Sequence, residues 1–175
     1  MWPSQPCGKQ GWSPDIYSPL IPLGVGGFAR FRRKFVTITS RNLRMKHRSA
    51  ELTQGPDRAP ARSYFRAMGL TQEDIDKPFV AIANLASDIT PCNVHLDRLA
   101  QAAKGGVREA DGTPFEFGTI TVSDGISMGT EGMKASLITR EVIADSIELV
   151  AFGQRMDGLI TVAGCDKNMP GCLMA

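Results

Sequence analysis

The sequence of 175 residues predicts an α/β fold, a parallel β-sheet with helices on both faces. Three short apolar runs rich in β-branched residues are typical of buried strands, at 79–84, 118–123 and 158–164. Two segments with helical spacing of apolar residues separate them, at 94–110 and 134–154. Strand, helix, strand, helix, strand in this order is typical of a parallel sheet built with crossover helices.

The predicted strands read FVAIAN, GTITVS and GLITVAG, a composition typical of strands covered on both faces. Each predicted helix carries apolar residues mostly three or four positions apart, which places them on one stripe. The stripes consist of Leu96, Leu99, Ala103 and Val107 in the first helix, and of Leu137, Val142, Ile143, Ile147 and Val150 in the second. The turns ADGTP and RMDG are expected to end these helices.

The charges divide the chain into two parts. Residues 1–45 carry seven Lys or Arg against one acid, Asp15, whereas residues 46–175 carry thirteen Lys or Arg against seventeen Asp or Glu. The first part is rich in proline and glycine and shows no clear period of 2 or 3.6. It is interpreted as a disordered leader, or as a gene-model extension ahead of Met45. Its Arg-rich, acid-poor composition leaves an organelle transit peptide open as the alternative.

The composition excludes several classes of function. Residues 46–175 contain no basic cluster with aromatic or motif support, so nucleic-acid binding is not expected. No apolar run approaches the roughly 20 residues that a membrane span needs. The four cysteines are too few and too widely spaced for a disulfide scaffold. We therefore expect a soluble cytoplasmic protein, with organelle import as the alternative.

The residues with ligand chemistry follow the three predicted strands. Cys92 lies in the loop after the first strand and Asp124 in the loop after the second. Cys165, Asp166 and Lys167 are consecutive after the third. Ligands of open parallel sheets bind outside the carboxyl ends of the strands. The sequence therefore predicts a binding site at this edge of the sheet.

The two thiols each allow a structural and a functional interpretation. Cys165 could simply be the last buried position of its strand, or a metal or cluster ligand. Cys92 could be an inert, half-buried thiol, or a thiolate favoured by the start of the following helix. Two sulfurs cannot by themselves complete a cysteine-only zinc or iron-sulfur site.

The carboxylates and the lysine allow similar alternatives. Asp124 and Asp166 offer the hard oxygens that Mg²⁺ prefers, but also fit an Asx-turn before Gly125 and a helix cap, respectively. Lys167 could be a solvated cation, a phosphate-binding charge or a lysine with a lowered pKa. An ammonium next to a divalent cation is repelled, so a direct role at a metal requires that its charge be removed, for example by reaction with CO₂.

The remaining candidates are interpreted as structural. His95 could be a ligand or a proton shuttle, but such a residue more often bonds a turn carbonyl. Cys172 lies in an apolar run and is expected to pack, and Cys7 lies in the leader. The glycine-rich segment 125–132 leaves a nucleotide-binding module open, although neither G-x-x-x-x-G-K-[ST] nor G-x-G-x-x-G occurs in the chain.

Several motifs resemble the dihydroxy-acid/6-phosphogluconate dehydratase family. They are TPCNVH, TVSDGISMGTEGM, TREVIADSIELV and GCDKNMPG, and the resemblance runs from about residue 49 to residue 175. RAPARSYFRAMGL and PFEFGTITVSDGISMG are more similar to the dihydroxy-acid branch of the family than to its sugar-acid branch.

The resemblance implies specific cofactors and ligands. Cys92 and Cys165 resemble two of the three thiolate ligands of a [2Fe-2S] cluster. Asp124 and Asp166 resemble Mg²⁺ ligands, and Lys167 resembles a lysine that is carboxylated to supply a further oxygen. Some family members have PGH where this chain has PCN and are associated with a [4Fe-4S] cluster, so the PCN sequence favours the [2Fe-2S] form.

The resemblance also implies an activity. The family dehydrates 2,3-dihydroxy carboxylic acids, and this branch converts 2,3-dihydroxy-isovalerate and 2,3-dihydroxy-3-methylvalerate to 2-keto acids in valine and isoleucine biosynthesis. The family's third cluster cysteine and its catalytic serine base follow the matched segment. We therefore expect an N-terminal fragment with no catalytic base of its own, inactive alone and homodimeric when full length. A sugar-acid dehydratase and a nucleotide-binding module remain the alternatives.

Overall fold

The computed structural model describes residue 46 and residues 48–175. Its elements follow in the order α2 (Ala50–Thr53), 3-10 helix η2 (Pro56–Arg58), α3 (Ala59–Ala67), α4 (Gln72–Asp76), β1 (Phe79–Asn84), α5 (Leu96–Glu109), β2 (Thr113–Gly118), α6 (Asp124–Ser127), α7 (Met133–Gly153), β3 (Gly158–Val162) and α8 (Asn168–Met174). The leader predicted for residues 1–45 lies outside the described residues.

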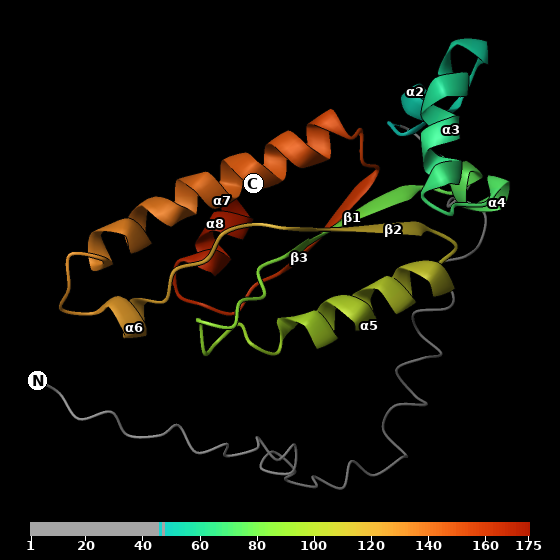
Figure 1. The fold of residues 1–175 in the computed structure, drawn as a ribbon. Helices are drawn as coiled ribbons and strands as arrows, with labels where there is room; N and C mark the ends of the chain where they lie inside the picture. Colours follow the sequence, from blue (N-terminus) through green and yellow to red (C-terminus); the bar gives the residue numbers. More distant parts are fainter. Residues whose placement is uncertain (1–45, 47) are drawn as a thin grey trace, which may run out of the picture. The chain divides into compact units, whose positions relative to one another are not determined.

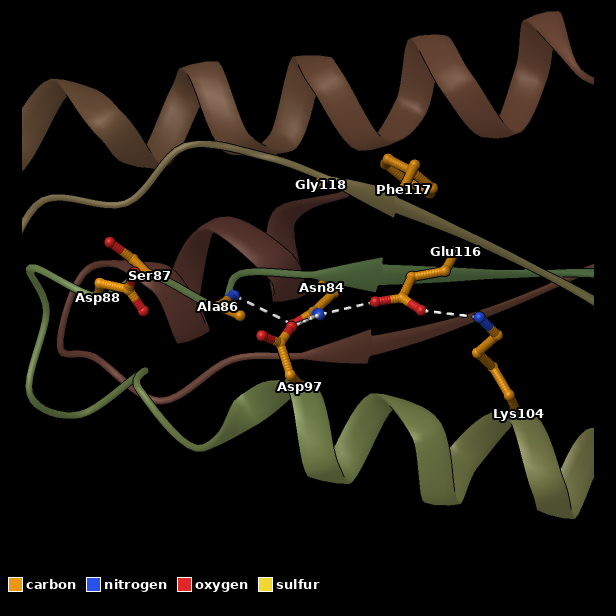
Figure 2. A pocket seen from close by; sticks show the side chains of 9 residues that line it. All are labelled: Asn84, Ala86, Ser87, Asp88, Asp97, Lys104, Glu116, Phe117 and Gly118. Carbon is orange, nitrogen blue, oxygen red and sulfur yellow. Dashed lines mark hydrogen bonds and ion pairs between the residues drawn. The ribbon is translucent and has the colours of Figure 1, made fainter. Parts of the chain in front are cut away.

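The three strands form one parallel sheet in the order β2-β1-β3. Helices α5 and α7 lie on opposite faces of this sheet (Figures 1 and 2). The predicted fold class is therefore confirmed. The central strand β1 is buried along almost its whole length, as its apolar run predicts.

The second strand was predicted at the wrong place. The sequence pattern indicated 118–123, whereas β2 is Thr113–Gly118 and pairs with β1 from Phe79 to Asn84. Because β1 ends at Asn84, residues 119–123, of which the first four are β-branched, have no strand to pair with. Pro114, which suggested a turn, is accepted because β2 is an edge strand in the described sheet.

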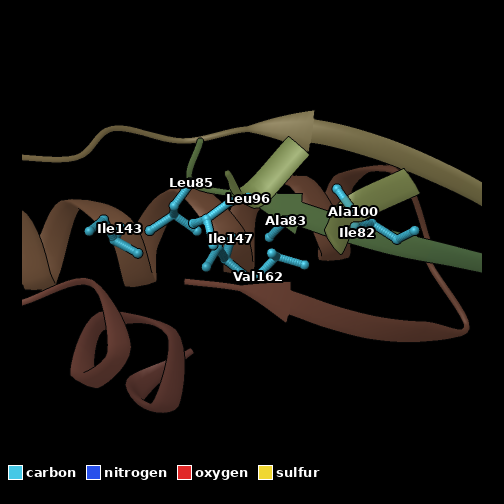
Figure 3. Packing of buried hydrophobic residues seen from close by; sticks show 8 residues of the cluster. All are labelled: Ile82, Ala83, Leu85, Leu96, Ala100, Ile143, Ile147 and Val162. Atoms are coloured by element: carbon cyan, nitrogen blue, oxygen red, sulfur yellow. The ribbon is translucent and has the colours of Figure 1, made fainter. Parts of the chain in front are cut away.

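The main hydrophobic core lies between the sheet and its two long helices, as Figure 3 shows. It consists of Ile82, Ala83, Leu85, Leu96, Ala100, Ile143, Ile147 and Val162. The predicted stripes are confirmed only in part, since Leu99, Leu137 and Val142 are exposed. A sheet of three strands covers only a narrow band of each helix, so the flanks of the predicted stripes remain in solvent.

A second, smaller core lies where the strands begin. The rings of Phe65 and Phe115 both pack edge-on against Phe79, with centroids 5.3 Å and 4.8 Å from its ring centroid. Phe79 is buried, and the Lys46 ammonium lies 4.0 Å above its ring. This aromatic cluster anchors the beginning of β1 to β2 and α3.

Asp157 joins three segments at the same edge. Its carboxylate accepts hydrogen bonds from the backbone N–H groups of Arg48 (2.7 Å), Ser49 (3.0 Å) and Phe79 (2.9 Å), and from the Ser49 hydroxyl. Burial opposes ionisation of Asp157, but these hydrogen bonds outweigh it and hold its pKa below the usual value. The carboxylate thus ties α2 and β1 to the turn before β3.

Four short helical elements precede the sheet, where the sequence analysis assigned none. Among them, α4 begins with a capping box, in which the Thr71 hydroxyl accepts from the Asp74 N–H and the Asp74 carboxylate accepts from the Thr71 N–H. Within residues 46 and 48–175, no helix combines the length and the hydropathy that crossing a membrane requires.

Candidate metal-binding and thiol site

Gly164 brings the two predicted cluster cysteines together. A Cβ on Gly164 would lie 2.3 Å from the Cys92 carbonyl oxygen, closer than any side chain allows. The loop after β3 therefore packs directly on the loop after β1 at a position that requires glycine. This contact places the buried Cys165 beside the exposed Cys92.

Of the two alternatives for Cys92, the thiolate with a lowered pKa is not supported. The neighbouring Cys165 thiol, with partial loss of solvent as a smaller contribution, raises the pKa of Cys92. Helix α5 begins only at Leu96, so its first turn does not reach the sulfur. In the metal-free chain the raised pKa therefore keeps the Cys92 thiol protonated at neutral pH.

Lys167 bridges the two predicted metal-ligating carboxylates. Its ammonium donates to Asp124 Oδ2 at 2.9 Å and to Asp166 Oδ2 in a shorter contact. The hydrogen bonds that Lys167 donates to Asp166 and Asp124 raise its pKa, so the alternative of a lowered pKa is wrong for the metal-free chain. Two carboxylate oxygens therefore already converge on one positive charge.

Ser136 completes this cluster, and the sequence analysis did not identify it. Its side chain is fully buried in α7 and donates to Asp124 Oδ1. This bond, followed by the one from Lys167, lowers the pKa of Asp124 and keeps it ionised. The only sequence signal was a serine in the predicted helix 134–154, because the partner lies twelve residues away on another element.

The structural alternatives for the two aspartates are not supported. Asp124 is the first residue of α6, and the cap is the Ser123 side chain, which accepts from the Ile126 N–H at 3.4 Å. The N-cap of α8 is Lys167 and makes no side-chain cap bond, while Asp166 contacts Lys167. Both carboxylates are thus available to the cluster with Lys167.

Of the remaining candidates, Cys172 has the structural role that was predicted, while the role of His95 stays a prediction. Cys172 is half-buried and packs against the main core, as predicted. His95 is exposed at the N-cap of α5 and makes no side-chain cap bond there. Cys7 lies outside the described residues.

Two buried asparagines, Asn93 and Asn168, and the half-buried Thr121 connect the loops that carry the candidate ligands. Asn168 Nδ2 lies 2.6 Å from Thr121 Oγ1, and Asn93 Nδ2 lies 3.4 Å from the same oxygen. Asn93 also donates to the Leu85 carbonyl at 2.5 Å. Neither the Asn93 nor the Asn168 side-chain oxygen has a hydrogen-bond partner in the described part of the chain. The apolar strand pattern gave no signal for this cluster.

A polar cavity of about 640 Å³ opens nearby, between β1, β2 and α5 (Figure 2). Asn84 Nδ2 donates to Asp97 Oδ1 at 2.7 Å and to Glu116 Oε1 at 2.8 Å, and Lys104 pairs with Glu116 at 3.0 Å. The bond from Asn84, followed by that from Lys104, lowers the pKa of Glu116. Cys92, Asp124, Cys165, Asp166 and Lys167 do not line this cavity, which the sequence analysis did not anticipate.

No three His, Cys, Asp or Glu side chains in residues 46 and 48–175 are grouped as a complete metal site. The candidate site instead contains a pair of thiols and a pair of carboxylates bridged by an ammonium. Soft sulfur and hard oxygen thus occur at the same edge of one sheet, a donor set suited to two different metals.

The sequence of the chain is similar to those of known proteins. The sequence profile described as "Dihydroxy-acid/6-phosphogluconate dehydratase N-terminal" matches residues 77–175. Proteins named dihydroxy-acid dehydratase are 67% identical in Natronomonas pharaonis and 64% in Haloarcula marismortui, each over 128 residues, or 73% of this chain and 22% of the relative. The Koribacter versatilis protein of that name is 58% identical over 138 residues, 79% of this chain and 24% of the relative.

The chain thus spans less than a quarter of the length of these relatives. The matched region contains all three strands and every candidate ligand described above. The chain belongs to the dihydroxy-acid/6-phosphogluconate dehydratase family.

Proposed function

We propose that this chain contributes part of the active site of an enzyme that removes water from 2,3-dihydroxy carboxylic acids. The substrates would be 2,3-dihydroxy-isovalerate and 2,3-dihydroxy-3-methylvalerate, and the products the 2-keto acids of valine and isoleucine biosynthesis. The observation that carries the proposal is the thiol pair beside the carboxylate-lysine cluster. The relatives named dihydroxy-acid dehydratase support this choice of substrate.

The residues present fit the cofactors that the family implies. Cys92 and Cys165 are adjacent, as two ligands of one [2Fe-2S] cluster must be. Asp124 and Asp166 already share one cation, so their oxygens are arranged for a positive charge such as Mg²⁺. When bound, Mg²⁺ would stabilise negative charge at the substrate carboxylate and 2-hydroxyl, and an iron of the cluster would help the 3-hydroxyl to leave.

The chain's own residues would hold these groups and orient the substrate. Ser136 fixes the Asp124 carboxylate, leaving Oδ2 free to face a cation. Lys167 must lose its positive charge to become a ligand. Addition of CO₂ to the neutral amine forms an N–C bond, releases a proton and replaces the ammonium by a carbamate with two oxygen donors. Mass spectrometry of the Mg²⁺-loaded protein would detect this modification.

A chimera tests the proposed activity. Residues 49–175 would replace the matching segment of the Koribacter versatilis relative, which supplies the rest of the enzyme. We expect reconstitution with iron, sulfide and Mg²⁺ to produce keto acid from 2,3-dihydroxy-isovalerate, and much less from aldonates. Preference for aldonates would instead assign the chain to the sugar-acid branch. Tight ATP or NAD binding without keto-acid formation would favour the nucleotide-binding alternative.

Three further proposals concern the activity of the unfused chain, the oligomeric state of the full-length protein and its location in the cell. The unfused chain should be inactive in this assay, because within the described residues only Cys92 and Cys165 lie together as candidate cluster ligands. The full-length protein should be a homodimer, which sedimentation of the chimera would measure. A cytoplasmic location is supported by the family, and fractionation of the source cells would check it.

A further inference from the structure

The loops that carry the candidate ligands meet at a single hydroxyl. Thr121, on the segment after β2, lies 2.6 Å from Asn168 Nδ2 and 3.4 Å from Asn93 Nδ2. Asn93 belongs to the loop after β1, and Asn168 begins α8 after β3. Both asparagine side chains are fully buried. One oxygen therefore contacts all three segments that follow the strands.

Each of these residues is close in sequence to a candidate ligand. Asn93 follows Cys92, and Asn168 follows Lys167. The backbone N–H of Asn168 donates to the Cys165 carbonyl at 3.0 Å, which closes the turn containing Cys165. A shift of either asparagine would therefore move its neighbouring thiol.

The connections to the sheet make this arrangement rigid. Asn93 Nδ2 donates to the Leu85 carbonyl at 2.5 Å, while the Leu85 N–H donates to the Val162 carbonyl at 3.1 Å. The Cys92 loop is thus tied to the ends of β1 and β3. Gly164 packs closely on Cys92 and Asn93 of this loop. A Cβ added at Gly164 would lie 2.3 Å from the Cys92 carbonyl oxygen and 3.2 Å from Asn93 Oδ1.

A hydroxyl is well suited to this junction. An uncharged hydroxyl oxygen can accept two N–H groups, whereas an aliphatic side chain accepts none. Replacing Thr121 by valine would keep the shape but leave two buried amide N–H groups without their common acceptor, which is costly in a buried site. The Asn168 amide would lose its only hydrogen bond to the described part of the chain.

We propose that Thr121 is a positioning residue whose hydroxyl, bridging Asn93 and Asn168, holds the Cys92 and Cys165 thiols face to face before any metal binds. Its importance for catalysis rests on the proposed function, but the positioning itself requires no metal and no substrate. The proposed function and the positioning by Thr121 can therefore fail independently. An inactive chimera would count against the function, but it would say nothing against the thiol geometry of the metal-free chain.

Thiol cross-linking in the metal-free chain tests the proposal. The chain would carry Cys7→Ser and Cys172→Ala, so that only Cys92 and Cys165 remain. A bifunctional thiol reagent that fluoresces only after joining two neighbouring thiols reports their proximity. We expect rapid cross-linking in this background, about tenfold slower cross-linking in Thr121→Val, and recovery in Thr121→Ser.

Thr119→Val is the matched control. Thr119 lies two residues earlier on the same segment, and its hydroxyl pairs with Ser146 at 2.5 Å, away from the bridge. We expect this variant to cross-link at the rate of the unaltered background. The proposal would be overturned by equal rates in Thr121→Val and the background, by equal losses in the two valine variants, or by failure of Thr121→Ser to recover the rate.

A measurement without a bridge mutation covers the case in which Thr121→Val does not fold. In the ¹⁵N-labelled chain, we expect the side-chain amide protons of Asn93 and Asn168 to exchange with solvent far more slowly than those of the exposed Gln154. Equal exchange for all three side chains would show that the bridge is not formed, and would overturn the proposal.

Discussion

Polar groups are arranged differently at the two edges of the sheet, the edge where the strands begin and the edge where they end. At the edge where the strands begin, one carboxylate, Asp157, is surrounded by hydrogen-bond donors and lies beside a packed aromatic cluster. At the edge where the strands end, two carboxylates compete for one ammonium and two thiols face each other. The first arrangement stabilises the fold, while the second brings charged groups and thiols together, where we propose that a ligand binds.

Polar arrangements that are unfavourable for folding occur at the edge where the strands end. Asp124 and Asp166 lie close enough to share the Lys167 ammonium, and without that positive charge their carboxylates would repel each other. Leaving the Asn93 and Asn168 oxygens buried without a partner in the described residues is also unfavourable. Such arrangements are typical of functional sites, whose cost the rest of the fold must offset.

The largest expected effect comes from removing a ligand at the carboxyl edge. In the chimera, Asp166→Asn should lower kcat/KM by about a thousandfold, ~4 kcal/mol of transition-state stabilisation, while visible cluster absorbance is retained. Cys165→Ser should instead lose that absorbance. Absorption spectra and keto-acid assays separate the two effects, with Cys172→Ala as the control that keeps both. An intact cluster in Cys165→Ser would refute the ligand assignment.

A change at the opposite edge should affect stability alone. Phe79→Ala removes a buried ring that packs against two others, and should lower the free energy of unfolding by about 3 to 4 kcal/mol. Denaturant unfolding measures this, and the exposed Phe152→Ala should cost less than about 0.5 kcal/mol. Under native conditions the cross-linking rate of Cys92 and Cys165 should not change. A large change in that rate would mean that the two edges are coupled.

Gly164→Ala tests the contact that joins the cysteine loops. The new methyl group would overlap the Cys92 carbonyl, a backbone atom that cannot turn aside, so we expect a loss of about 2 to 3 kcal/mol and slower thiol cross-linking. Gly158→Ala is the matched control, because its Cβ would meet the Val80 side chain at an ordinary 3.7 Å. Similar behaviour of both variants would argue against a close approach of the two loops.

The smallest effect is expected for Asp157→Asn, which should cost about 1 to 2 kcal/mol at neutral pH by weakening its hydrogen bonds. Because folding lowers the pKa of Asp157 from its ordinary 3.8, its contribution is complete above that value and is lost as the pH falls through the folded-state pKa. The difference between wild type and variant should therefore shrink below about pH 4. The exposed Asp145→Asn provides the control, and a difference that grew on acidification would contradict the sign.

The sequence pattern predicted the elements whose signal is local, and it was wrong where pairing decided the outcome. FVAIAN became the central strand because an apolar run of this length is stable only when covered on both faces. TITVS has the same composition but lies beyond the end of its neighbour, Asn84, and forms no strand. The second strand is formed instead by TPFEFG, whose six residues pair with β1 along its whole length.

The sequence by itself determined the family, the parallel α/β class and the edge where ligand chemistry gathers. These follow from short motifs and from the rule that parallel strands end at the same edge. Only the tertiary structure decided that Gly164 must pack on Cys92, that Ser136 holds Asp124, and that Thr121 joins Asn93 to Asn168. The physical reason is distance along the chain: these partners lie 12 to 72 residues apart, so no local pattern could place them in contact.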